Sequence, residues 1–558
     1  MVHIKEQTGS VREYHFPVLQ RNSEKKNRSV IRRTADRTEI SAGFSCLERS
    51  AFMTETTVQA SIFQRIKAAV KDGELPEMFS VSPASGNENE IRFADGALDG
   101  IRIYHMAMTE ITEETESMME RAVTAAGNGA YETAESLFEE LGRDCGAAVL
   151  IDALQNHIMS RTQELDPNVI ASFASQMVTE SYDRECVKFG LAILELFNTD
   201  EIPSVKEIVK TACLSDEFAL FSIFVMMKWR DGNQEIFELA KKLHGWGRIH
   251  AVERIEPRTP EIRRWFLMEG VDNNVMPSYS ALSCWIRSDA EQLLNSHPSE
   301  EEFSGIRKLL SALLDEGPVQ GISALENAEE IILSFLKTAG TMRLTIADYE
   351  LINEIQRRFA KESESIAEAC RQLFSADACR RVIEEAAKGG RDTEIADEMG
   401  IEFRSELLDI LASSFAAQYM KCGVLMKDKE YRDRVIRIFA ENLPLAEMAA
   451  GPGLTLGLGK EYWREAALEC LLQQLGEMPM EGQQFVETAL QCAPVRTRNC
   501  GLNVLESWVN SASVPLKELL PGFYQLLKRL RDTEPDEKVK ARMDRLTAGE
   551  VKFENSIE

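Results

Sequence analysis

DGNQEIFELAKKLHGWGRIHAVERI, from Asp231 to Ile255, is the stretch that decides the fold of this chain. It predicts two amphipathic helices joined by a tight turn that contains glycine. Each predicted helix places its apolar residues on one face, namely Ile236, Leu239, Ala240 and Leu243 in the first and Ile249, Val252 and Ile255 in the second. Neither helix can bury that face alone, so each needs neighbouring helices of the same kind.

The same helical pattern continues from Thr109 almost to the end of the chain, with short loops between successive segments. Several of these segments begin with an N-cap residue or a first-turn proline, as at Asp166–Pro167 and Pro203–Ser204. Short loops favour antiparallel packing of consecutive helices. The sequence therefore predicts an all-α protein built from stacked helix pairs.

Three predicted second helices share a plan: each begins with an arginine, has small residues near its fourth position and an aliphatic residue near its eighth. The arginines are Arg248, Arg464 and Arg496. This plan resembles the inner helix of HEAT repeats. The 32 residues that separate Arg464 from Arg496 are fewer than the repeat of about 40 expected for that class. We therefore predict an irregular HEAT-like helical-repeat solenoid.

The region before the helical body is predicted to form two parts. Residues 1–52 hold ten Lys or Arg against six Asp or Glu without a sustained helical period, which indicates a disordered basic extension. A cleaner pattern opens at Met53, so Met53 is a candidate native start; the alternative is that residues 1–52 form a basic targeting arm. Residues 53–107 are expected to form a helix and then a small β-hairpin within Ile91–Met106, because two short alternating runs there carry Asp-Gly pairs. We expect this part to cap the stack.

A looser Gly/Pro segment at Glu316–Ala324 is the predicted break in the helical body. It would separate a first half, residues 108–315, from a second half, residues 325–531. Residues 532–558 are expected to form a charged C-terminal tail.

Composition excludes several classes of function. The net charge of −27 argues against nucleic acid and against an anionic membrane surface as partners. The longest apolar run, Phe218–Met227, is shorter than the roughly 20 residues that a membrane span requires and predicts a buried core helix. The 11 cysteines form no C-x-x-C pair, and the chain begins without a signal-peptide pattern, which together predict a cytoplasmic protein with small buried thiols.

Sequence motifs for cofactor chemistry are missing. The glycine-rich segment Gly451–Lys460 lacks the spacing of a phosphate-binding loop, so we interpret it as a loop between helices. The sequence has no Glu-x-x-His pair, no His-x-Asp/Glu pair, no haem-thiolate loop and no G-x-S-x-G elbow. We find no haem, flavin or metal motif.

The candidate functional residues lie in the stretch quoted first. Trp246, Arg248, His250 and Glu253 are close together in the sequence and could line a concave groove. The alternative is that His250 is a satisfied core or groove residue, as histidines in helices usually are.

Two segments resemble a known family. Ile91–Met106, IRFADGALDGIRIYHM, and His244–Ile255, HGWGRIHAVERI, are similar to Firmicutes proteins carried under the name limonene hydroxylase, and the likeness runs from about Met53 to the C-terminus. The resemblance implies a monooxygenase that converts limonene to carveol and perillyl alcohol. It further implies O₂, NAD or NADP as the electron source, NAD-linked oxidation of perillyl alcohol to the aldehyde, and a partner reductase. It carries no catalytic residues.

Two functions from different classes are therefore open. The first is terpene hydroxylation, which the resemblance implies, although hydroxylation of an unactivated C–H bond depends on a cofactor. The second is a non-catalytic HEAT-like scaffold that binds a protein partner along its concave face.

Overall fold

The computed structural model describes residues 60–76, 79–81, 93–106, 111–317, 319–391 and 393–549. These residues are mostly helical, and the one β pairing among them is an isolated bridge between Lys71 and Glu74. The all-α prediction is therefore confirmed. The predicted extension, residues 1–52, and the candidate start at Met53 lie outside the described residues.

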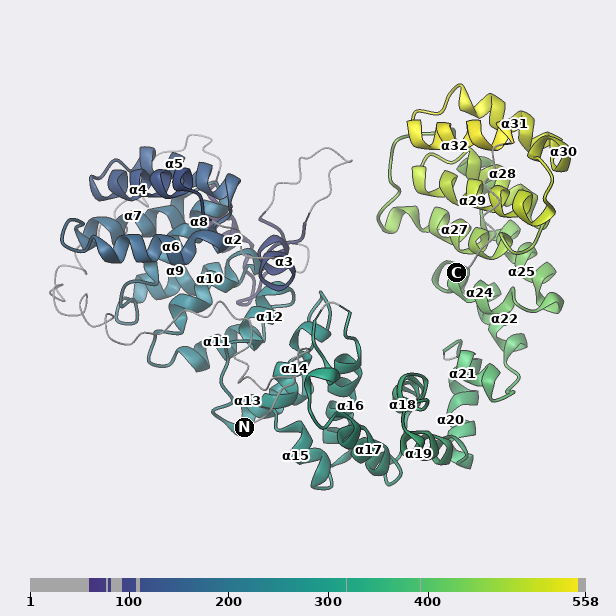
Figure 1. Cartoon of the computed structure of the whole chain (residues 1–558), viewed down its shortest axis with the longest axis horizontal. Helices are drawn as coiled ribbons and strands as arrows, with labels where there is room; N and C mark the ends of the chain where they lie inside the picture. Colours follow the sequence, from purple (N-terminus) through teal and green to yellow (C-terminus); the bar gives the residue numbers. More distant parts are fainter. Residues whose placement is uncertain are drawn as a thin grey trace. The chain divides into compact units, whose positions relative to one another are not determined.

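The described chain divides into two compact units, unit 1 up to Met342 and unit 2 from Arg343 onward. The predicted break at Glu316–Ala324 lies inside unit 1, where Ile322–Ala324 form a short 3₁₀ helix, η2, that contacts α16 and α17. The helices of unit 1 are α2 (Ile62–Ala69), α3 (Ala97–His105), α4 (Glu113–Gly127), α5 (Tyr131–Asp144), α6 (Ala147–Ser160), α7 (Pro167–Glu180), α8 (Arg184–Leu194), α9 (Pro203–Cys213), α10 (Asp216–Met226), α11 (Gly232–Ala240), α12 (Trp246–Val252), α13 (Pro260–Met268), α14 (Ser278–Arg287), α15 (Ala290–Asn295), α16 (Glu300–Leu314) and α17 (Ala328–Ala339) (Figure 1).

Unit 1 is built from consecutive helix pairs: α7 with α8, α9 with α10, α11 with α12, and α13 with α14. The second helices of these pairs, α8, α10, α12 and α14, each contact the next, and we call them the second-helix row. The predicted core helix is confirmed, because every residue from Phe218 to Met226 in α10 is buried, while Met227 is exposed.

Hydrogen bonds between successive pairs of unit 1 show a regular period. Trp229 Nε1 donates to Thr199 Oγ1, 30 residues earlier. The Gly247 N–H donates to Asp216, 31 residues earlier, and Ser283 Oγ donates to Glu253, 30 residues earlier. Successive pairs in this part of unit 1 therefore repeat about every 30 residues.

Unit 2 continues with helical segments of more uneven length. Its helices are α18 (Ile346–Phe359), α19 (Glu364–Phe374), α20 (Asp377–Lys388), α21 (Thr393–Glu398), α22 (Arg404–Ser413), α23 (Phe415–Gln418), η3 (Tyr419–Lys421), α24 (Cys422–Leu425), α25 (Lys429–Asn442), α26 (Leu445–Met448), η4 (Lys460–Tyr462), α27 (Trp463–Leu475), α28 (Gln483–Leu490), α29 (Val495–Ala512), α30 (Leu516–Leu519), α31 (Pro521–Arg531) and α32 (Glu537–Ala548). Part of the predicted tail at 532–558 is thus α32, which packs on α29 and α31.

The predicted β-hairpin is wrong where the structure can test it. Ile101–Tyr104, the second predicted strand, lies inside α3, whereas Ile91 and Arg92 of the first lie outside the described residues. The Asp-Gly pair at 95–96 does make a turn, with Gly96 at φ 75°, but that turn begins a helix. Burial of one face of α3 against other helices of unit 1 overrides the local preference for a strand.

Candidate functional site

Helix α3 lies across the second-helix row of unit 1, beside α10 and α12 (Figure 1). At its start, the Gly96 N–H donates to Glu217 Oε2 of α10 over 2.7 Å. In its middle, Gly100 faces the Trp246 ring of α12 so closely that a Cβ there would overlap the ring. At its end, the rings of Tyr104 and Tyr279 of α14 meet edge to face at 5.2 Å. One short helix thus contacts α10, α12 and α14 of the row.

A cluster of buried charged residues links α3 to α8. The Lys188 ammonium of α8, whose side chain is 1 % exposed, lies 2.7 Å from Asp99 of α3, 2.7 Å from Glu217 and 2.9 Å from Glu185. Burial lowers the pKa of Lys188, but the charges of Asp99, Glu217 and Glu185 outweigh burial and leave that pKa above its usual value. Lys188 therefore stays charged and holds α3 by an ion pair shielded from water.

Three of the four predicted groove residues meet α3 or its neighbours. Trp246 and His250 are buried, with ring centroids 6.2 Å apart, and Glu253 accepts a hydrogen bond from Ser283 Oγ of α14 over 2.6 Å. Positions 246, 250 and 253 share one face of a helix because they are separated by four and then three residues. The face they share is covered by α3 and α14 and is not an open groove.

Arg248 faces away from that surface, as its place two residues after Trp246 requires. It is buried, and its guanidinium donates to the Leu243 carbonyl that follows α11 and to the Glu269 carbonyl that ends α13, over 3.2 and 2.8 Å. Arg248 therefore ties the ends of neighbouring helices together. In unit 2 the counterpart is Arg498, which donates to the Cys492 carbonyl after α28 and pairs with buried Glu534; Arg496, which the sequence plan selected, is partly exposed.

Two titratable groups near α3 are perturbed by burial. Burial, with a smaller effect of Arg254, lowers the pKa of His250 well below its usual value, and its buried Nε2 has no hydrogen-bond partner among the described residues. Burial raises the pKa of Asp216 to about 6, against the opposing effect of hydrogen bonds from the Gly247 and Gly245 backbone. His250 is thus neutral at pH 7, which suits a packed position rather than a general base.

Sequence reasoning missed Lys188 and Asp99, although one signal was present. Lys188 stands within the run CVKFGLAIL, from Cys186 to Leu194, in which every other residue is apolar or glycine. A lysine in the middle of a buried helix requires a carboxylate partner. The local sequence contains nothing that identifies Asp99 as that partner.

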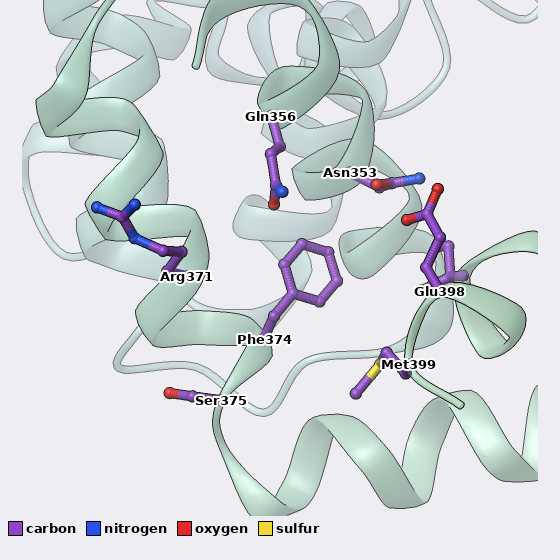
Figure 2. Close-up of a pocket in the computed structure, with 8 residues that line it drawn as sticks. Asn353, Gln356, Arg371, Phe374, Ser375, Glu398 and Met399 are labelled. Carbon is purple, nitrogen blue, oxygen red and sulfur yellow. The ribbon is translucent and has the colours of Figure 1, made fainter. Parts of the chain in front are cut away.

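A second candidate site lies in unit 2, at a pocket of about 330 Å³ between α18, α19 and α21. Figure 2 shows Gln356 of α18 directed toward the Phe374 ring, while the Asn353 amide of the same helix points toward Glu398. The pocket is lined by Asn353, Gln356, Arg371, Phe374, Ser375, Ile395, Glu398 and Met399. None of these residues was predicted from the sequence. The polar Asn353, between the buried Ile352 and Ile355, was the one local indication of a polar site on this helix.

One group of side chains has the spacing of metal ligands. Glu135, Glu139 and Cys186 offer ligand atoms within 4.8 Å of one another. Cys186 Sγ donates to the Glu135 carbonyl, and burial followed by three acidic neighbours raises the pKa of the thiol. A thiol in that state is a poor metal ligand, because metals bind the thiolate. All cysteines in the described ranges are free, and most are buried, as predicted.

Comparisons with protein-family models, with curated proteins and with solved structures find no match to this chain. Within the residues that the structure describes, no helix has both the length and the apolar character that crossing a bilayer requires.

Proposed function

We propose that this chain is a non-catalytic HEAT-like scaffold whose second-helix row in unit 1 binds helical protein segments. The observation that carries the proposal is the seating of α3. This short helix from outside the row contacts all four of its members, through a buried ion pair, a backbone hydrogen bond to Glu217, a glycine contact and an aromatic cluster. These are the elements of helix-in-groove recognition between separate proteins: an apolar face, anchors at helical spacing and one charged contact that sets the register.

The anchors of α3 explain how the row selects its helix. Asp99 supplies the charge for Lys188. Tyr104 packs against both Trp246 and Tyr279, with centroid distances of 5.9 and 5.2 Å, and those two rings also contact each other at 4.9 Å. Glycine at position 100 lets the helix approach the Trp246 ring. A partner helix that displaces α3 would therefore carry Asp or Glu, then a small residue, then an aromatic residue one turn later.

Binding in trans tests this proposal. Asp99→Lys combined with Tyr104→Ala in the full-length chain is designed to release α3, and a fluorescent synthetic peptide of residues 93–106 is then titrated in. We expect saturable binding to this variant that is at least about tenfold tighter than to the wild type, whose site is already filled. A peptide that carries Asp99→Lys is the matched control and is expected to bind weakly.

Two outcomes decide the test. Circular dichroism shows whether the double variant is folded. If it is folded but does not bind the wild-type peptide, the row holds α3 only because α3 is part of the same chain, and the proposal fails. If the double variant is unfolded, the Tyr104→Ala single variant, which keeps the Lys188–Asp99 pair, replaces it in the same titration.

Terpene hydroxylation with NAD or NADP and O₂, together with a partner reductase, stays a prediction of the family resemblance. Incubation of the purified chain with limonene, NADPH and O₂, followed by chromatography for carveol and perillyl alcohol, tests it directly. Product formation would replace the scaffold proposal. The cytoplasmic location likewise stays a prediction, which cell fractionation tests.

A further inference from the structure

The pocket of unit 2 contains polar groups that the described chain leaves without partners. Asn353 is 9 % exposed and its side chain makes no hydrogen bond within the described residues. Gln356, one helical turn later on α18, has a buried Oε1 that also lacks a partner. Buried polar groups in folded proteins are nearly always paired, because an unpaired one costs free energy. The Gln356 Oε1 is one such exception. Together with the Asn353 amide beside it, which also lacks a hydrogen bond in the described chain, it points to a ligand that completes both groups.

The chemistry of these two amides defines the ligand. The Gln356 Oε1 is an acceptor and requires an N–H or O–H donor, while the Asn353 amide offers both a donor and an acceptor. Figure 2 shows the two side chains above the Phe374 ring, with Met399 on the same side of the pocket as Glu398. A peptide main chain brings an N–H and a C=O to such a pair, and it places an apolar side chain against the floor.

The charged residues at the edge of the pocket, Arg371 and Glu398, contribute little to the choice of ligand. Arg371 already pairs with Glu364 and Glu368, and Glu398 lies 3.5 Å from Arg357, all on exposed side chains. Exposed ion pairs of this kind contribute little to binding. The volume of about 330 Å³ is at the lower end of the roughly 300–1,000 Å³ that ligand pockets span. The pocket therefore suits one or two residues of an extended chain.

We propose that the pocket lined by Asn353, Gln356 and Phe374 binds an extended peptide segment. The Gln356 Oε1 accepts a main-chain N–H of the peptide, the Asn353 amide bonds the neighbouring main-chain groups, and an apolar side chain packs on Phe374 and Met399. This is a second binding surface, in unit 2 and for extended chain, and it does not rest on the helix-binding proposal for unit 1.

Selection from a random peptide library tests the site. A phage library that displays peptides of about 12 residues is panned on the immobilised full-length chain, and the enriched peptides are synthesised with a fluorescent label. Their affinity is measured by anisotropy for the wild type and for Asn353→Leu, Gln356→Leu and Gln356→Glu. Gln372→Leu is the matched control, since Gln372 lies on α19, is exposed and bonds Glu368 outside the pocket lining.

We expect the enriched peptides to share an apolar residue and to lose at least about tenfold in affinity with Asn353→Leu and Gln356→Leu. Gln356→Glu, which keeps an acceptor, is expected to retain binding, as is Gln372→Leu. N-methylation of the main chain at the shared apolar residue is expected to abolish binding. The proposal is overturned if no peptide is enriched, or if enriched peptides bind the folded leucine variants as tightly as the wild type.

Discussion

The surface under α3 in unit 1 and the amide pocket in unit 2 are made from the same kind of helix pairs, yet they differ in how their polar groups are satisfied. Under α3, the Lys188 charge is surrounded by Asp99, Glu185 and Glu217. In the pocket, Asn353 and the Gln356 Oε1 have no partner in the described chain. The difference teaches that the occupying helix neutralises the buried charge of the covered surface, although His250 Nε2 there stays without a hydrogen bond in the described chain. In the open pocket no such occupant pairs the Gln356 Oε1.

The largest effect is expected at the covered surface, from Lys188→Met. This change removes the cation that Asp99, Glu185 and Glu217 share, and leaves Asp99 and Glu217 only the more distant Arg102 and Arg184, each at 3.8 Å. We expect a cost of about 3–5 kcal/mol. Denaturant unfolding of unit 1 and hydrogen exchange across Ala97–His105 measure the loss of stability and the release of α3. Lys241→Met is the control, because its pair with Glu238 is exposed and is worth about 1 kcal/mol or less. Equal effects of the two variants would contradict the assigned role of the cluster.

The next largest effect is expected where α3 closely approaches the Trp246 ring of α12. Gly100→Ala places a methyl group into the Trp246 ring, so α3 must shift, at a cost of about 1–3 kcal/mol. Gly522→Ala in α31 is the control, because a Cβ there meets nothing within 4 Å, and it is expected to raise helix stability by about 0.5–1 kcal/mol. If both substitutions stabilise, α3 is not packed as described.

An effect of similar or smaller size concerns Asp216 and depends on pH. Burial raises its pKa from 3.8 to about 6 in the folded state, so the folded chain holds this proton more tightly than the unfolded chain does. The free energy of unfolding from this group therefore decreases as pH rises from about 4 to about 6 and remains lower above that range. Asp216→Asn keeps an acceptor for the Gly247 N–H and removes the charge.

We expect Asp216→Asn to stabilise unit 1 by about 1–3 kcal/mol above pH of about 7 and to have little effect near pH 4. Chemical unfolding at several pH values measures the difference. Asp272→Asn, an exposed partner of Lys308, is the control. A gain in stability that does not increase with pH would show that the charge of Asp216 is not its cause.

The smallest effect is expected in the open pocket. Asn353→Leu replaces an unsatisfied amide by an apolar group of similar size, so the free energy of unfolding of unit 2 should change by less than about 1 kcal/mol or increase. Thr497→Val is the contrasting control, since the buried Thr497 hydroxyl donates to Glu469 over 2.6 Å and its loss should cost about 1–3 kcal/mol. A large loss for Asn353→Leu would mean that the amide is structural.

What the sequence by itself determined is the class of fold. Apolar residues at helical spacing predicted the helices, the short loops predicted their pairing, and the run Phe218–Met227 predicted a core helix, because periodicity along a helix is a local property. The spacing of residues along the chain also explains why α12 has two different faces. Trp246, His250 and Glu253 lie on one face, and Arg248 lies on the other.

Only the tertiary structure decided the sites. Gly96 bonds Glu217 across 121 residues, and Asp99 pairs with Lys188 of another helix; no local pattern encodes such contacts. For the same reason the Asp-Gly turn at 95–96, a hairpin signal when considered alone, begins a helix here. Burial against distant helices outweighs a local preference of about 1 kcal/mol or less, and it also decides which polar groups, such as Asn353, remain unpaired.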